Sequence, residues 1–96
     1  KKSCNNEEDY FWELPFWNNY EKHIDSFVAD LNNSGSTSFA GAITAALFLQ
    51  KFVKNKKKFL HIDAYAWNDR YQPGRPLGGE ASLLRGLFSF LCKRYG

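Results

Sequence analysis

The sequence predicts an α/β fold built on a short parallel β-α-β unit with flanking helices. Residues 39–54 (FAGAITAALFLQKFVK) are apolar almost all round, which is typical of a buried helix. Residues 59–67 (FLHIDAYAW) form a short apolar run bounded by charge, which favours a buried strand. Residues 26–33 (SFVADLNN) predict a strand before the helix. The crossover is long enough for parallel strands, whose sheets are covered by helices.

The chain has 96 residues, so it holds at most one domain. A chain of this size buries only about 60–65% of the surface that it exposes when unfolded. It nevertheless carries 3 Trp, 5 Tyr and 9 Phe, whose side chains need to be buried. We therefore expect a partner surface to cover them, and a fragment of a larger protein is one simple explanation. It starts at Lys1 without Met or a signal-peptide pattern, so we expect a missing or processed N-terminus.

The elements before the central helix follow from local signals. Residues 1–9 are polar and acidic and predict a loop. Pro15 is expected to precede a short helix whose apolar face recurs at three- and four-residue steps, with Trp17, Tyr20, Ile24 and Phe27. The turn NNSGSTS uses the conformational freedom of Gly35, and Thr37 or Ser38 is the expected N-cap of the central helix.

The elements after the central helix are a strand, a loop and a helix. Lysines in 54–58 mark a solvated turn before the strand at 59–67. Residues 68–79 (NDRYQPGRPLGG) predict a loop because they hold two prolines and three glycines. Glu80 is expected to open the last helix, where a negative charge suits the helix dipole. Its apolar stripe consists of Leu84, Leu87, Phe88, Leu91 and Tyr95.

Charge, cysteine usage and hydropathy restrict the function classes. A net charge of +3 does not indicate a nucleic-acid-binding domain, although the lysine turn leaves phosphate contacts open. Cys4 and Cys92 are isolated, which favours reduced, buried thiols and leaves a disulfide open. The apolar run Phe39–Leu49 is shorter than the roughly 20 residues that cross a bilayer, so no membrane span is predicted.

The candidate site residues in the sequence do not make a complete catalytic set. His61 and Asp63 would share one face of a strand, like half of a metal site, but a zinc site needs three or four ligands and the only other histidine is His23. A hydrogen-bonded polar pair is the favoured interpretation. The loop PGRPLGGE precedes a helix and leaves an anion site or a subunit contact through Arg75 open, but a structural loop is favoured.

An ordered series of stretches resembles a known family. WELPFWNNYEKHIDSFVADLNNSG is followed by SFAGAITAALFLQKFV, then HIDAYAW, then PGRPLGGEASLLRGLFSFL. The series is similar to the C-terminal part of the leucyl (cytosol) aminopeptidase family. The resemblance implies that residues 1–96 are an incomplete catalytic domain, the C-terminal segment of a larger mixed-sheet domain, and hence a partial three-layer fold.

The resemblance also implies an activity. The family removes N-terminal residues from peptides with two divalent metal ions, zinc or manganese, and usually forms cytoplasmic homo-hexamers. Its motif Asn-Thr-Asp-Ala-Glu-Gly-Arg, which carries metal ligands and a catalytic arginine, does not occur here. No catalytic residue or metal ligand is therefore carried over, and we expect the chain alone to be inactive and metal-free.

The residues that can be carried over form one wall of the substrate pocket. In the family, the segment after His-x-Asp borders the pocket for the substrate's N-terminal side chain, and here it is Tyr65, Ala66, Trp67 and Asn68. Tyr65 stands where several relatives have a smaller residue, so it would narrow the pocket. Ala64 also departs from the family, which usually has a larger aliphatic residue there.

Two alternatives belong to other function classes. The first is a small non-catalytic interaction or nucleic-acid-binding module that uses the lysine turn and exposed aromatic residues. The second is a stand-alone degenerate homologue with a scaffolding role.

Overall fold

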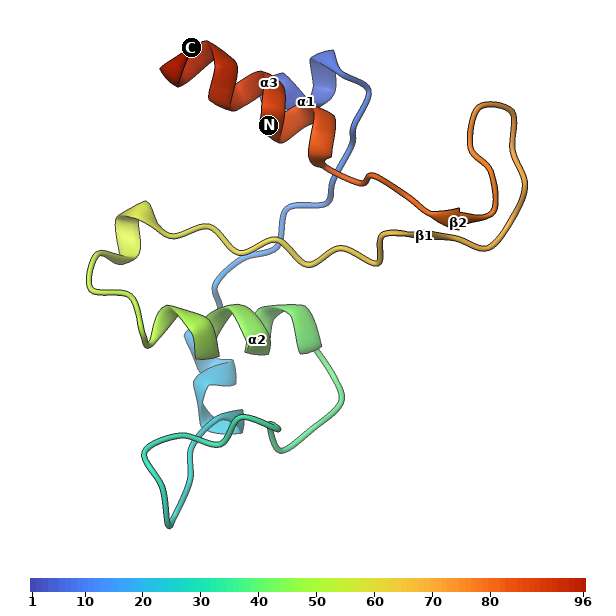
Figure 1. Cartoon of the computed structure of the whole chain (residues 1–96). Coiled ribbons are helices and arrows are strands. Elements are labelled where there is room, and N and C mark those ends of the chain that lie inside the picture. Colours follow the sequence, from blue (N-terminus) through green and yellow to red (C-terminus); the bar gives the residue numbers. More distant parts are fainter. The chain divides into compact units, whose positions relative to one another are not determined.

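The computed structural model describes residues 1–96 and divides them into two compact units (Figure 1). Unit 1 consists of Lys1–Trp12 and Ala64–Gly96, and unit 2 is Glu13–Asp63, which lies between them in the sequence. The elements are α1 (Lys2–Asn6), the 3-10 helix η1 (Asn18–His23), α2 (Gly41–Gln50), the 3-10 helix η2 (Lys56–Lys58), β1 (Trp67–Asn68), β2 (Gly78–Gly79) and α3 (Leu84–Tyr95).

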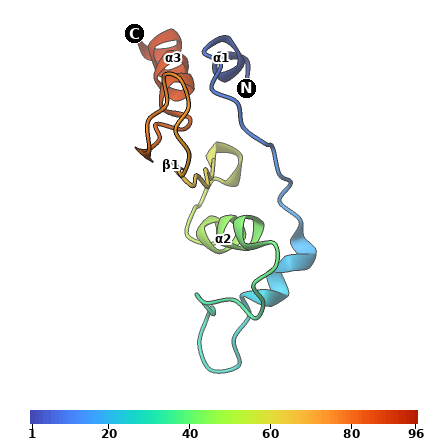
Figure 2. The same cartoon turned by 90° about the vertical axis from the view of Figure 1, so that its right-hand side faces the viewer.

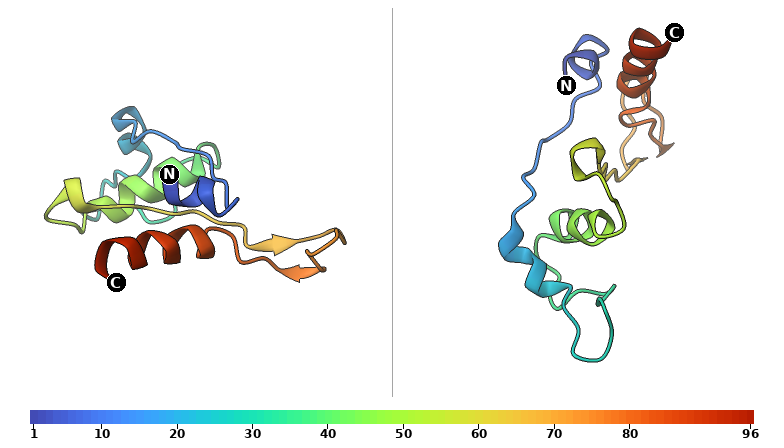
Figure 3. Two further views of the ribbon diagram at one scale, coloured as in Figure 1. Left: turned by 90° about the horizontal axis from the view of Figure 1, so that it is seen from above. Right: turned by 90° about the vertical axis from the view of Figure 1, so that its left-hand side faces the viewer.

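In unit 1, α1 lies beside α3, so the two ends of the chain meet in the same unit (Figures 2 and 3). The contact depends on Gly86, which is buried. A β-carbon at this position would lie 2.8 Å from the Cα of Cys4. Cys4 is itself 6% exposed. A glycine at 86 is therefore what lets the two helices approach this closely.

The N-terminus of α3 is capped by a residue from the other end of the chain. Oδ1 of Asp9 accepts a hydrogen bond from the Leu83 N–H at 2.8 Å, and Oδ2 accepts one from the Gly86 N–H at 3.0 Å. The helix has no side-chain cap from its own N-cap residue, Leu83, which adopts a left-handed backbone with φ 63°. Asp9 thus satisfies two of the donors that every helix start leaves without an intrahelical partner.

In unit 2, η1 packs on α2 around two side chains that are almost fully buried. Ile24 follows η1 and is 2% exposed, and Leu47 on α2 is 1% exposed. At the edge of this contact, Nζ of Lys51 lies 2.8 Å from Oε2 of Glu21. The short helix predicted after Pro15 is confirmed as a 3-10 helix. Its predicted apolar face is not, because Trp17 and Phe27 are exposed.

The predicted parallel β-α-β unit is not formed in this chain. The sheet consists of two strands that pair antiparallel, β1 with β2. Residues 26–33 form bends and irregular backbone, and of the predicted strand at 59–67 only Trp67 is in a strand. Phe27 is 110% exposed and Leu60 73% exposed, so neither segment has the cover that a buried parallel strand needs.

Element ends also differ from the predictions, for local reasons. Residues 2–6 form α1 because Asn5 and Glu7 donate to carbonyls one helical turn back. The central helix begins at Gly41, after a left-handed Ala40, while Thr37 accepts from the Phe39 N–H at 3.2 Å and caps only a turn.

The last helix and the second cysteine also depart from expectation. α3 begins at Leu84, because Glu80 is held by the neighbouring hairpin through its backbone N–H. Both cysteines are free thiols, but Cys92 is exposed. The predicted apolar stripe of α3 is exposed at Leu84, Phe88, Leu91 and Tyr95. In length and hydropathy, every helix falls short of what crossing a bilayer requires.

Candidate functional site

The predicted pocket-wall segment enters the hairpin of unit 1. Tyr65 is 82% exposed and Trp67 is 56% exposed. Ala66 between them has φ 53°, a left-handed backbone that costs a residue with a β-carbon roughly 1–2 kcal/mol. Asn68 is half-buried. Along this segment the side chain of Asn68 is hydrogen-bonded inside the hairpin, whereas the rings of Tyr65 and Trp67 are largely exposed to solvent.

The loop predicted at 68–79 is an ordered hairpin. Trp67 pairs with Gly79 and Asn68 with Gly78. The tip closes on itself: the Arg75 N–H donates to the Gln72 carbonyl at 2.9 Å, and the Gln72 N–H donates to the Arg75 carbonyl at 3.0 Å. Pro73-Gly74 with φ 74° at the glycine matches a type II turn, which needs a positive φ at its third position.

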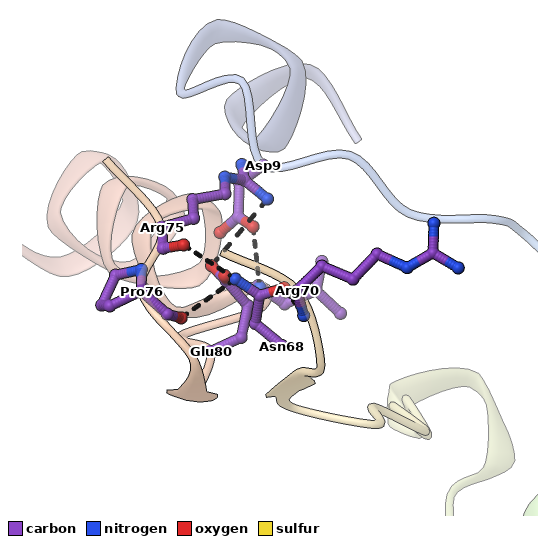
Figure 4. A network of polar contacts seen from close by, with 7 residues as sticks. Asp9, Asn68, Arg70, Arg75, Pro76 and Glu80 are labelled. Atoms are coloured by element: carbon purple, nitrogen blue, oxygen red, sulfur yellow. Dashed lines mark hydrogen bonds and ion pairs between the residues drawn. The ribbon is translucent and has the colours of Figure 1, made fainter. Parts of the chain in front are cut away.

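Asn68 connects the strand pair to the tip. Its Nδ2 donates to the carbonyl oxygens of Arg75 and Pro76, both at 2.9 Å, and its Oδ1 accepts from the Arg70 N–H at 3.3 Å (Figure 4). The carboxamide thus uses both donor hydrogens and its acceptor inside the hairpin. In the same view the Arg70 side chain extends away from this network.

Glu80 connects the other side of the wall segment to the end of the hairpin. Its backbone N–H donates to the Ala66 carbonyl at 2.9 Å, which helps hold the left-handed residue. Its Oε1 lies 3.9 Å from Nη1 of Arg75, a long ion pair with the arginine side chain about half exposed. Arg75 is therefore used by the hairpin itself, which favours the structural interpretation of the PGRPLGGE loop over an anion site.

His61 and Asp63 do not form a shared site. Nε2 of His61 is buried and has no hydrogen-bond partner, whereas Asp63 is exposed. No three side chains among His, Cys, Asp and Glu gather closely enough to hold a metal ion.

One cavity lies in unit 2, away from the wall segment in sequence. Its volume is about 320 Å³, and Oγ1 of Thr44 on its lining is buried without a partner. The lining residues come from the end of η1, the following loop and α2: Ile24, Asn33, Ser34, Gly35, Thr37, Gly41, Thr44, Ala45, Phe48 and Leu49. Thr44 was not singled out from the sequence.

The chain matches one family along most of its length. Residues 1–87 match the family model described as "Cytosol aminopeptidase family, catalytic domain". Proteins named "Probable cytosol aminopeptidase" include one from Geobacter sulfurreducens, 43% identical over 83% of this chain and 16% of its own length. One from Persephonella marina is 39% identical over 90% of this chain and 18% of its own length.

A solved structure agrees with the relatives. The crystal structure of the cytosol aminopeptidase from Coxiella burnetii matches 99% of this chain with a TM-score of 0.88 and 44% identity, over 21% of the length of that enzyme. The chain therefore spans only about a fifth or less of the length of these proteins. With its family model, relatives and structural match in agreement, the chain belongs to the cytosol aminopeptidase family.

Proposed function

We propose that this chain is the C-terminal part of the catalytic domain of a leucyl-type aminopeptidase, which hydrolyses N-terminal residues from peptides. The observation that carries the proposal is the match of 99% of the chain to a cytosol aminopeptidase at a TM-score of 0.88. The complete enzyme would be cytoplasmic and would assemble as a homo-hexamer. The chain alone would be inactive.

The ligands of the two divalent ions, zinc or manganese, would come from the rest of the enzyme. The lack of a three-residue ligand cluster in this chain is compatible with that division. This chain would contribute the pocket wall Tyr65–Asn68, with Tyr65 narrowing the pocket.

The exposed apolar segments support the same division of roles. Phe27 and Val28 are 110% and 98% exposed, and Leu60 is 73% exposed. A solvated surface of this kind marks a missing neighbour. We propose that the segments 26–33 and 59–66 become parallel strands, and complete a three-layer fold, only when the strands of the remaining catalytic domain lie beside them.

A chimera tests the proposal. The part of the Coxiella burnetii enzyme that this chain matches is replaced by the chain, giving the complete chimera. We expect the complete chimera to release leucine from leucyl-p-nitroanilide, while the enzyme without that part, and the chain alone, do not. A chimera that folds and forms the assembly of its parent, yet cleaves no aminoacyl substrate, would sink the proposal.

A further inference from the structure

The hairpin has a gap that its backbone cannot bridge. Between the pair Asn68–Gly78 and the bridge Gln72–Arg75, one strand has three residues (69, 70 and 71) and the other has two (76 and 77). This mismatch resembles a β-bulge, at which ladder hydrogen bonds are lost. One of the two residues is Pro76, which has no N–H to donate. The β1–β2 ladder therefore stops at Asn68.

The carboxamide of Asn68 supplies hydrogen bonds where the backbone ladder has none. It donates to both the Arg75 and Pro76 carbonyls at 2.9 Å, so one side chain joins the tip of the hairpin to its base (Figure 4). The Arg75 carbonyl accepts this bond together with the one from Gln72, which uses both of its lone pairs. An aspartate of the same shape has no donor to offer when ionised and could not do this.

The consequence falls on the two residues before Asn68. Trp67 is paired with Gly79, which carries no side chain, so no cross-strand neighbour there orients the indole. Ala66 holds a left-handed conformation, supported by the bond from the Glu80 N–H to its carbonyl. The β1–β2 pair is only two residues long. The backbone conformation of residues 65–67 therefore depends on the hydrogen bonds that close the rest of the hairpin.

We propose that Asn68 is a positioning residue that closes the hairpin and thereby sets the path of Tyr65–Trp67, and with it the preference for the substrate's N-terminal side chain. The inference rests on the proposed function, because it assigns a specificity role to the same wall. In this role Asn68 does not contact the substrate. Its side chain is hydrogen-bonded to the Arg75 and Pro76 carbonyls inside the hairpin, and it acts on the wall through them.

The experiment compares Asn68→Asp and Asn68→Ala with the matched control Arg70→Ala in the complete chimera. Arg70 is in the same hairpin, but its side chain is exposed and extends away from the network. The readout is the ratio of kcat/KM for leucyl- and alanyl-p-nitroanilide. Both variants lose the two hydrogen bonds to the Arg75 and Pro76 carbonyls, and Asn68→Ala also loses the one from the Arg70 N–H. We expect a change of about tenfold in this ratio for both. The change is expected in KM for the leucyl substrate, while kcat for the alanyl substrate stays the same.

The possible outcomes distinguish a positioning role of Asn68 from a general structural role. A shifted ratio in both Asn68 variants with an unchanged ratio in Arg70→Ala supports positioning. An unchanged ratio in the Asn68 variants overturns it, and so does an equal loss of activity toward both substrates, which would make Asn68 a general requirement of the fold. An unsubstituted chimera without activity overturns the proposed function and this inference together, so the two failures are distinguishable.

Discussion

Oδ2 of Asp9 accepts a hydrogen bond of 3.0 Å from the backbone N–H of Gly86, seventy-seven positions further along the chain. The same carboxylate accepts from Leu83, so one side chain near the first residues caps the last helix. Burial alone would raise the pKa of Asp9, but the bonds from Gly86 and Leu83 and the charge of Arg85 bring it below its ordinary value.

Asp9→Ala is expected to weaken the start of α3. Loss of an N-cap side chain costs typically about 1 kcal/mol, so the backbone amides of Leu83 and Gly86 should exchange their hydrogen several-fold faster. Hydrogen exchange measured residue by residue checks this. Glu7→Ala, at an exposed acid on the same segment, is the control and should leave exchange at both amides unchanged.

The pH dependence of this cap has a definite sign. The folded-state pKa of Asp9 is depressed, so the unfolded state takes up the proton more readily. The stabilisation by the cap is therefore fully present above about pH 4, and it is lost as the pH falls through the folded-state pKa. Stability measured from pH 7 to pH 2 should fall less in Asp9→Ala than in the unsubstituted chain. Parallel pH curves for the two would contradict the capping role.

Gly86→Ala is expected to separate α1 from α3. Alanine normally gains about 1 kcal/mol over glycine inside a helix, but the new β-carbon would lie 2.8 Å from the Cα of Cys4, and such overpacking costs about 1–3 kcal/mol. Thermal unfolding of the complete chimera and exchange of the α1 amides measure the net loss. Gly79→Ala is the matched control, since its β-carbon would meet nothing within 4 Å. Equal stability of the two variants would show that the helices can move apart freely.

Lys51→Met tests the ion pair between α2 and η1. The hydrogen bond from Lys51 lowers the pKa of Glu21, but both side chains are about one-third exposed. We therefore expect a loss of less than about 1 kcal/mol at low salt, and no difference from the unsubstituted protein in 1 M salt. Urea unfolding at the two salt concentrations measures this, and a large salt-independent loss would show that the pair matters through packing.

Phe27→Ser with Val28→Ser tests the uncovered surface. The 96-residue chain alone is expected to self-associate, because both side chains are almost fully exposed in it. Light scattering over a range of concentrations should show smaller assemblies for the double variant than for the unsubstituted chain. Asn33→Ser, in the following turn, should not change the distribution. A monodisperse unsubstituted chain would remove the reason to expect a neighbour at this surface.

Tyr65→Gly tests the pocket wall directly. If Tyr65 narrows the pocket, its removal in the complete chimera should raise kcat/KM for bulky N-terminal residues by about tenfold and leave that for alanine nearly unchanged. Tyr71→Ala, at an exposed tyrosine nearer the hairpin tip, is the control. A uniform change for all substrates would assign Tyr65 a structural role.

Local signals indicated η1, α2 and α3, but not α1, which was predicted as a loop. Apolar residues at three- and four-residue steps after Pro15 indicated the helix that Ile24 follows, and the apolar run around Leu47 indicated α2. Their ends were less predictable, because the α3 cap comes from Asp9 at the far end of the sequence. No short-range pattern carries that information.

Strand pairing was the part that the sequence could not decide. The apolar run at 59–67 was predicted as a buried strand, but a strand needs a partner, and Leu60 is 73% exposed in this chain. The hairpin was missed because its two-residue strands are too short to show alternation. Its closing residue, Asn68, was assigned to a wall from resemblance alone, and the bonds to Arg75 and Pro76 were visible only in three dimensions.

The capping of α3 by Asp9 has a consequence for synthesis on the ribosome. Asp9 leaves the ribosome before its partners Leu83 and Gly86, which follow it by more than seventy residues. The ribosome must translate the whole of unit 2 before unit 1 can close. Unit 2 is thus free to fold before residues 1–12 meet their partners, and a premature stop before residue 83 would release a chain whose α1 has no α3 to pack against.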